Sequence, residues 1–173
     1  SNVHTPLKDG TTYSYRIRAI NTAGATSDWS EPASAATKVV PEAPTGLQAS
    51  KGKARIIELI WDANKEKDIA AYVVETSMTA DRGFSEVRRI PAGEERTLKQ
   101  EGLSPNLTRY YRIKAVDADG LVGGWSDVVA GSTKPLPDAP KELAVEWKDD
   151  GALLRWTPPP QTDVVRYRLL NKR

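Results

Sequence analysis

The stretch YRIRAINTAGATSDWS, residues 15–30, returns in outline as YRIKAVDADGLVGGWS, residues 111–126. The correspondence extends beyond the two quoted stretches: 13 of the 33 residues from 15 to 47 are identical to those 96 positions later. A period of this length is too long for a solenoid repeat and fits a whole small domain. We therefore predict that the chain contains consecutive domains of similar structure.

A second set of residues recurs at a slightly shorter spacing. Trp61 and Tyr72 return as Trp156 and Tyr167, 95 positions later, which implies one deleted residue in the intervening loop. Both stretches keep register over their own lengths, so the repeat covers most of the chain.

Apolar and polar residues alternate within each repeat as they do in β-strands. In KARIIELIW, residues 53–61, the side chains of Ile57, Leu59 and Trp61 share one face. Runs of this kind, separated by turn residues, number about seven in each repeat, the count of an antiparallel β-sandwich. The predicted fold class is all-β, with sandwiches in tandem.

The order of these segments resembles the fibronectin type III domain, an immunoglobulin-like β-sandwich. The resemblance rests on a proline-bounded first strand, a strand that ends in tryptophan, a tyrosine-bearing strand, a leucine leading into the sixth strand, and a Gly-Gly-Trp-Ser sequence. These segments read PEAPTGLQAS (41–50), IELIWD (57–62), AYVVET (71–76), LSPNLTRYYRIKAVD (103–117) and GGWS (123–126). The resemblance implies a complete domain at residues 39–136, the C-terminal half of a domain at 1–38 and the N-terminal half of another at 137–173.

The junctions between these units have nearly the same sequence, TKVVPEAP (37–44) and TKPLPDAP (133–140). Proline fixes φ and favours an extended conformation in the residue before it, so we predict short, stiff linkers and a rod-like array.

The family's tyrosine corner, in which a tyrosine six residues after a leucine bonds back to the backbone, fits only one unit. Leu7 and Tyr13 have this spacing, but the position six residues after Leu103 is Arg109. Either Tyr110 substitutes through a shifted register, or the corner is missing from the complete domain. A missing corner would lower the stability of that domain.

The tryptophans have different expected roles. Trp61 and Trp156 match the family's core tryptophan, and with Tyr72 and Tyr13 they form the predicted structural core. For Trp147, partial burial at a strand end and a surface contact are both open.

Trp29 and Trp125 begin the last strand beside basic side chains on the outer face of the sixth strand. We expect cation–π stacks of Trp29 with Arg16 and Arg18, and of Trp125 with the equivalent pair, Arg112 and Lys114. The competing interpretation is an exposed tryptophan that stacks on sugars or anchors a protein partner.

Loops at the ends of a sandwich commonly carry binding residues. Two loops of the complete domain provide candidates of this kind, residues 62–68 and 117–124. The candidate binding residues are Asn64, Lys65, Glu66, Lys67, Leu121 and Val122.

Composition excludes several classes of function. With 25 basic and 23 acidic residues the net charge is +2, and no lysine- or arginine-rich run suggests nucleic-acid binding. No apolar run approaches the roughly 18 residues that cross a bilayer, so we expect no membrane insertion. Cysteine is absent and His4 is the single histidine, so we expect no metal or cofactor, no catalytic residues and no enzymatic activity.

Half sandwiches would expose apolar side chains such as Tyr15 and Trp156 to water. We therefore expect the half-domains to pair between molecules, with residues 1–38 of one chain completing 138–173 of another.

By analogy with the family, we expect a non-catalytic spacer and protein-binding repeat array that acts in adhesion, outside the cell or on its surface. The sequence WDANKEKDIAAYVV (61–74) resembles bacterial versions of the domain, some of which are lipid-anchored adhesins that bind matrix proteins such as fibronectin. The second hypothesis is a set of accessory linker domains in a secreted polysaccharide-degrading enzyme, in which case carbohydrate could be the ligand.

Overall fold

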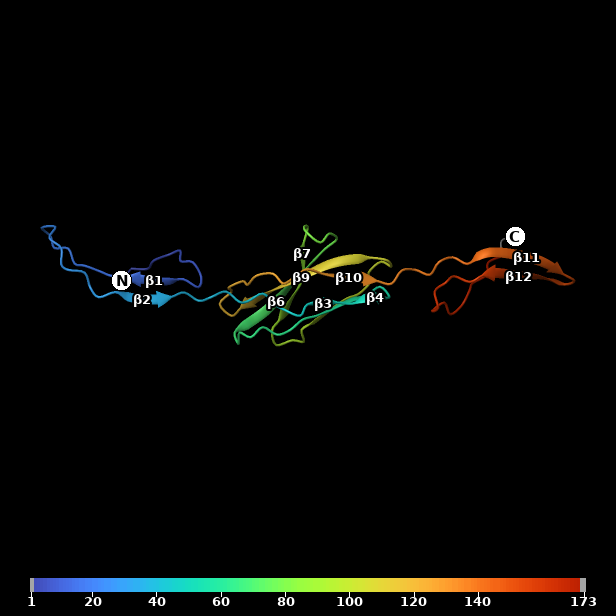
Figure 1. Cartoon of the computed structure of the whole chain (residues 1–173), viewed down its shortest axis with the longest axis horizontal. Helices are drawn as coiled ribbons and strands as arrows, with labels where there is room; N and C mark the ends of the chain where they lie inside the picture. Colours follow the sequence, from blue (N-terminus) through green and yellow to red (C-terminus); the bar gives the residue numbers. More distant parts are fainter. Residues whose placement is uncertain (1, 172–173) are drawn as a thin grey trace.

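The computed structural model describes residues 2–171, which form twelve strands and no helix. The strands fall into three parts that follow one another along one long axis (Figure 1). A short first part and a short last part flank a complete unit in the middle. Among the described residues no helix is long and apolar enough to cross a membrane.

The first part is a pair of antiparallel strands, β1 (Thr12–Tyr15) and β2 (Ala33–Ala36), in which Tyr13 lies opposite Ala35. The last part is a second antiparallel pair, β11 (Lys141–Lys148) and β12 (Gly151–Thr157). The first pair corresponds, at the 96-residue spacing, to two strands of the complete unit, β9 (Thr108–Asp117) and β10 (Val129–Thr133).

The complete unit is a sandwich of two sheets. One sheet has the order β3 (Gln48–Ala49), β5 (Ile57–Ile60) and β8 (Thr97–Gln100). The other has the order β4 (Lys51–Lys53), β10, β9, β6 (Ile69–Ser77) and β7 (Ser85–Pro91). This is the all-β, immunoglobulin-like arrangement that the sequence predicts.

The first predicted strand of the unit divides between the two sheets at Ser50. Its first half, β3, pairs antiparallel with β5, and its second half, β4, pairs parallel with β10. Ser50 makes bonds to both sides: its amide donates to the carbonyl of Glu58, and its own carbonyl accepts the amide of Ser132. One continuous strand therefore helps to close the sandwich along an edge.

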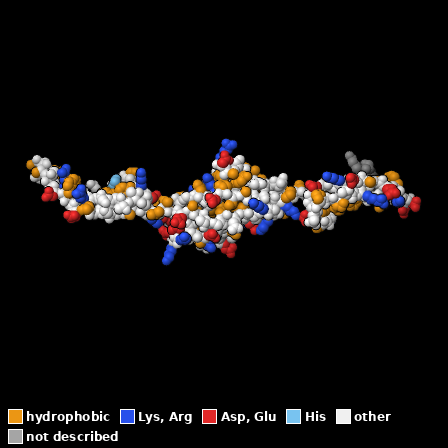
Figure 2. All heavy atoms as spheres, viewed as in Figure 1, with side chains coloured by type: hydrophobic (Ala, Val, Ile, Leu, Met, Phe, Trp, Pro, Cys, Tyr) orange, Lys and Arg blue, Asp and Glu red, His pale blue; other side chains and the backbone are white. Residues whose placement is uncertain are grey.

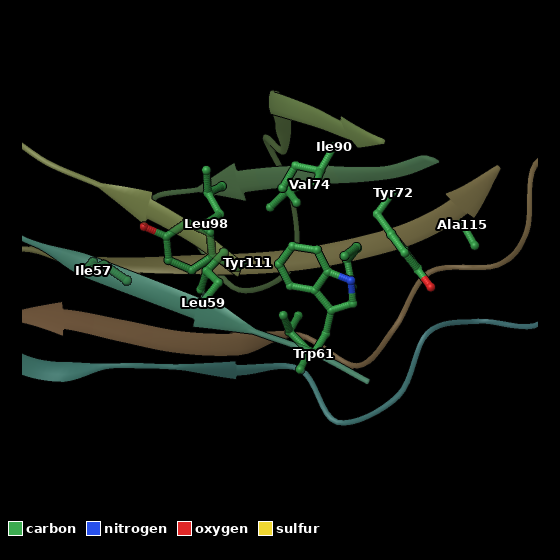
Figure 3. Packing of buried hydrophobic residues seen from close by; sticks show 11 residues of the cluster. Ile57, Leu59, Trp61, Tyr72, Val74, Ile90, Leu98, Tyr111 and Ala115 are labelled. Carbon is green, nitrogen blue, oxygen red and sulfur yellow. The ribbon is translucent and has the colours of Figure 1, made fainter. Parts of the chain in front are cut away.

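The core lies between the two sheets of the complete unit, where Trp61 and Tyr72 meet edge to face with ring centroids 5.7 Å apart (Figure 3). The alternation in residues 57–61 explains how β5 reaches this core: Ile57, Leu59 and Trp61 are buried, whereas Ile60 is half exposed. The other buried members of the cluster are Leu47, Tyr72, Val74, Ile90, Leu98, Tyr111, Ile113 and Ala115.

Tyr13 and Trp156 lie half-buried and do not enter a closed core, which differs from the sequence-based prediction. Each belongs to a part with a single pair of strands, so no second sheet within residues 2–171 covers it. Trp156 instead packs edge to face on Tyr167, with centroids 5.1 Å apart. Trp147, for which burial and exposure were both open, is 82% exposed.

The tyrosine corner is present in the first part and, among the described residues, absent from the complete unit. In the first part the hydroxyl of Tyr13 accepts the amide of Lys8 at 3.0 Å. In the complete unit, among the described residues, the Tyr110 hydroxyl makes no such bond. There Thr133 ties the loop to the last strand, because its hydroxyl donates to the Ser104 carbonyl and accepts the Leu107 amide. The corner is therefore missing, as one of the two alternatives had it.

Candidate interaction sites

Trp29 and Trp125 each lie four residues before the last strand of their part, β2 or β10, and not at its start as the sequence predicts. Basic side chains lie over both rings. The Arg112 guanidinium is 4.1 Å and the Lys114 ammonium 4.3 Å from the Trp125 ring centroid. In the first part, Arg18 is 4.7 Å and Arg16 6.0 Å from the ring of Trp29. The structure thus brings together each set of residues that the sequence groups, at cation–π distances.

The serine after each tryptophan fixes the position of the ring. The hydroxyl of Ser126 accepts the amide of Ile113 at 3.1 Å, and Ser30 accepts the amide of Ile17 at the same distance. These bonds hold the tryptophan segment against the neighbouring strand, in the place that a regular strand pair would otherwise take.

Arg112 has further partners that sequence reasoning did not identify. Its guanidinium contacts a second aromatic ring besides Trp125, since the Phe84 centroid lies 4.2 Å from it. Two of its nitrogens also donate to the Glu75 carboxylate, at 2.7 and 2.9 Å. Glu75 lies opposite Arg112 in the pairing of β6 with β9, so this stack is joined to a cross-strand ion pair.

Asn64 and Glu66, two of the candidate binding residues, are engaged by the chain itself. The Asn64 side chain donates to the carbonyl of Glu42 at 2.9 Å. The backbone amide of Asn64 donates to the Tyr72 hydroxyl. The Glu66 carboxylate accepts the amide of Glu42 at 2.6 Å. This bond is the main reason that the pKa of Glu66 lies below its ordinary value. These two side chains hold the linker and are not free to hold a partner.

The other four candidate binding residues lie closer to solvent. Lys65 and Lys67 are exposed on the same loop, residues 62–68. On the second loop, Val122 is 46% exposed and Leu121 is half-buried. Both loops border the linker, since a side chain at Gly123 would meet the carbonyl oxygen of Pro41 at 2.5 Å.

The linker lysine Lys38 is enclosed by three carboxylates of the complete unit. Its ammonium lies 2.6 Å from Asp68, 2.7 Å from Asp117 and 2.5 Å from Asp119. Figure 2 shows acidic and basic side chains gathered at the end of the complete unit that faces the first part. The hydrogen bonds, first of all that to Asp117, raise the pKa of Lys38, and the lysine lowers the pKa of Asp117.

The three carboxylates are close enough together to hold a metal ion, because their oxygens lie within 4.8 Å of one another. The Lys38 ammonium contacts all three, so the chain's own cation supplies the neutralising charge. The Asp117 side chain is 1% exposed, and one of its oxygens also accepts the amides of Asp119 and Leu121. This cluster orders the loop after β9.

Sequence reasoning missed this cluster because it assigned Lys38 to a linker and Asp68 to a candidate binding loop. A signal was available in the repeat itself. Lys38 recurs as Lys134 after 96 residues, and Asp68 recurs as Asp163 after 95.

A hollow of about 410 Å³ beside β11 and β12 is lined by apolar side chains that include Pro140, Leu143, Trp156 and Tyr167. Trp156 corresponds in the repeat to the core residue Trp61, so the hollow is the inner face of an incomplete sandwich. Such a face is a surface for packing against a second sheet and not a ligand pocket. The pairing of half-domains between molecules, which would cover this face, stays a prediction.

His4 does not belong to a catalytic set within the described residues. It is 2.8 Å from the Tyr15 hydroxyl and packs edge-on against the rings of Tyr13 and Tyr15. These contacts give it a place in the packing of the first part.

No family model matches the chain. Among curated proteins it is similar to fibronectin type-III domain-containing protein 3a of Gallus gallus, with 27% identity over 179 residues. The match covers 94% of this chain and 14% of the chicken protein, so the chain spans about a seventh of that relative's length.

Two solved structures illustrate the similarity in fold. The sixth fibronectin type III domain of human fibronectin type III domain containing protein 3 is 24% identical, covering 57% of this chain and 91% of that one, with a TM-score of 0.48. A Fn3-like protein from Clostridium thermocellum is 20% identical, covering 57% and 99%, with a TM-score of 0.47. A bacterial source for the present chain stays a prediction. The strand order and the core tryptophan give the complete unit the fibronectin type III fold.

Proposed function

We propose that the chain is part of a non-catalytic spacer and protein-binding array that works outside the cell or on its surface. The observation that carries the proposal is the end-to-end arrangement of the three parts (Figure 1). A row of small sandwiches joined by proline-bounded linkers holds its ends far apart, which suits a spacer.

The binding role is assigned to the pole of the complete unit that faces the first part. Within the described part of the chain, Lys65, Lys67 and Val122 make no hydrogen bonds or ion pairs with the linker, whereas Asn64 and Glu66 do. Two exposed lysines on one of these loops and an exposed apolar side chain on the other offer contacts for an acidic protein surface. A matrix protein such as fibronectin is the partner class that we propose.

The test is solid-phase binding of the full chain to immobilised fibronectin at about 0.15 M salt, where charges more than about 8 Å apart are screened. We expect saturable binding that falls at least about tenfold in a Lys65→Glu, Lys67→Glu double variant, because like charges across an interface are unfavourable. The matched control is Lys51→Glu with Arg96→Glu, two exposed residues outside these loops. Absence of binding, or equal loss in both variants, would exclude this site and leave a spacer alone.

A further inference from the structure

The contacts that fasten the first linker recur at the second linker, at equivalent positions of the repeat. Lys134, 96 residues after Lys38, forms an ion pair with Asp163, 95 residues after Asp68. As at the first junction, a lysine at the end of one unit's last strand meets an aspartate of the next unit. The Lys134 ion pair lowers the pKa of Asp163 below its ordinary value.

A backbone contact recurs with the ion pair. At the first junction the Glu42 amide donates to Glu66, and at the second the Asp138 amide donates to the side-chain oxygen of Gln161 at 3.1 Å. Glu66 and Gln161 differ in charge but both present an oxygen to the linker. The shared feature is therefore the geometry of the contact and not the charge of its acceptor.

At the first junction the linker also reaches the second loop of the unit. Asp117 and Asp119 complete the cluster around Lys38, and Gly123 leaves space for the Pro41 carbonyl. Residues 38–42 are thus held by both polar loops of the complete unit. Lys38 lies two residues after the end of β2. The position of Lys38 therefore fixes where the first part ends.

We propose that these contacts form a junction clamp, which sets the orientation of each unit relative to the next. The clamp consists of the lysine that ends one unit and of the loop aspartate and loop acceptor of the following unit: Lys38, Asp68 and Glu66, or Lys134, Asp163 and Gln161. The inference goes beyond the proposed binding role and does not depend on it.

The physical reason is that the three carboxylates at the first junction repel one another unless a cation lies between them. Asp117 cannot turn to solvent, because two backbone amides hold it in a buried position. Docking of Lys38 therefore stabilises the loop, and the loop in turn holds the linker. The orientation of the first part is therefore coupled to the order of the loop. Salt weakens this coupling by screening the exposed ion pairs of Lys38 with Asp68 and Asp119.

The full chain provides a direct test, because it contains no cysteine. Spin labels are attached at Glu31→Cys and Glu86→Cys, one on each side of the first junction, and their distance distribution is measured by pulsed dipolar spectroscopy. A second label pair, Glu86→Cys with Glu94→Cys, lies within the complete unit and reports whether that unit stays folded. Both label pairs are measured in the parent chain, in Lys38→Met and in the control Lys51→Met.

We expect a narrow distribution across the junction at about 0.02 M salt, and a width that roughly doubles at about 1 M salt, where the screening length falls to about 3 Å. Lys38→Met broadens the distribution by a similar factor at low salt, and Lys51→Met leaves it unchanged. The distribution within the unit stays the same throughout. A broad distribution in the parent chain at low salt, or a narrow one in Lys38→Met, would overturn the proposal.

Discussion

The hydroxyl of Thr133 donates a hydrogen bond of 2.7 Å to the carbonyl oxygen of Ser104, 29 residues earlier in the chain. Thr133 is 4% exposed, and its bonds hold the loop that the tyrosine corner also holds in the first part. The equivalent threonine of the first part, Thr37, donates to the carbonyl of Lys8 at 2.7 Å. Two side chains, Tyr13 and Thr37, therefore fasten this loop in the first part, whereas among the described residues Thr133 is the one side chain that does so in the complete unit.

Replacing Thr133 with valine keeps the shape of the side chain and removes its hydroxyl. We expect a loss of about 1–3 kcal/mol in the unfolding free energy of the complete unit, because the part-buried hydrogen bonds of the Thr133 hydroxyl to Ser104 and Leu107 are both lost. Urea unfolding followed through the amide resonances of residues 57–61 measures this loss. A change below about 0.5 kcal/mol, the usual effect of a surface substitution, would show that the hydroxyl has no fastening role.

Gly123 and Gly124 form a natural matched pair. A Cβ at Gly123 would lie 2.5 Å from the Pro41 carbonyl oxygen, whereas one at Gly124 would meet only the Ala43 side chain at an ordinary 3.7 Å. We expect Gly123→Ala to displace the linker and to destabilise the unit by about 1–3 kcal/mol, as overpacking does. Gly124→Ala should have little effect. Amide hydrogen exchange at Glu42 would rise in the first variant only, and equal exchange in both would contradict the prediction.

Arg112 differs from its repeat equivalent Arg16 in having a carboxylate partner, Glu75. We expect Arg112→Met to destabilise the complete unit by about 1–3 kcal/mol, since it removes charge-assisted hydrogen bonds and leaves Glu75 largely buried without a cation. Arg16→Met should change stability by less than about 0.5 kcal/mol. Unfolding curves for the two variants, compared with the parent chain, separate the contacts that Arg112 makes with Glu75 and Phe84 from the cation–π contact with tryptophan that both arginines make.

The depressed pKa values of Asp117 and Glu66 predict a loss of stability in acid. A carboxyl group whose pKa is lower in the folded state stabilises the fold above its ordinary pKa, which is 3.8 for Asp117. That stability is lost as the pH falls through the lower, folded value. We expect unfolding free energy to be steady near about pH 6 and to decline below about pH 4.

Asp117→Asn supplies the control for this pH dependence. The asparagine side chain keeps an oxygen that can accept the amides of Asp119 and Leu121, but it has no proton to gain in acid. The variant should be less stable near neutral pH and should show a flatter decline between about pH 4 and about pH 2. An unchanged slope would mean that other carboxyl groups cause the acid sensitivity.

The fold was predictable because the signals for it are local and repeated. The alternation that ends in Trp61 and the spacing from Tyr111 to Trp125 each specify one strand and the face it buries. The stacks of Trp29 and Trp125 could be anticipated for the same reason, since arginine and tryptophan recur together. Tyr13 and Trp156 are half-buried and not in a closed core as predicted. Their burial depends on whether a second sheet covers them, and no local sequence pattern indicates that.

The linker contacts were harder to predict. Lys38 and Asp117 are 79 residues apart in the printed sequence, and nothing around either residue indicates a partner. Their meeting depends on which loops lie at one pole of the sandwich, a property of the folded unit. Likewise, nothing in the sequence around Asn64 and Glu66 indicates that their side chains bind the linker at Glu42.

One period of the repeat, residues 39–134, contains the aspartate of one junction clamp, Asp68, and ends with the lysine of the next clamp, Lys134. A duplicated copy of the segment therefore carries both halves of a joint, one for the unit before it and one for the unit after it. The array can be lengthened or shortened by whole units without designing a new connection, and every added unit points the same way along the chain.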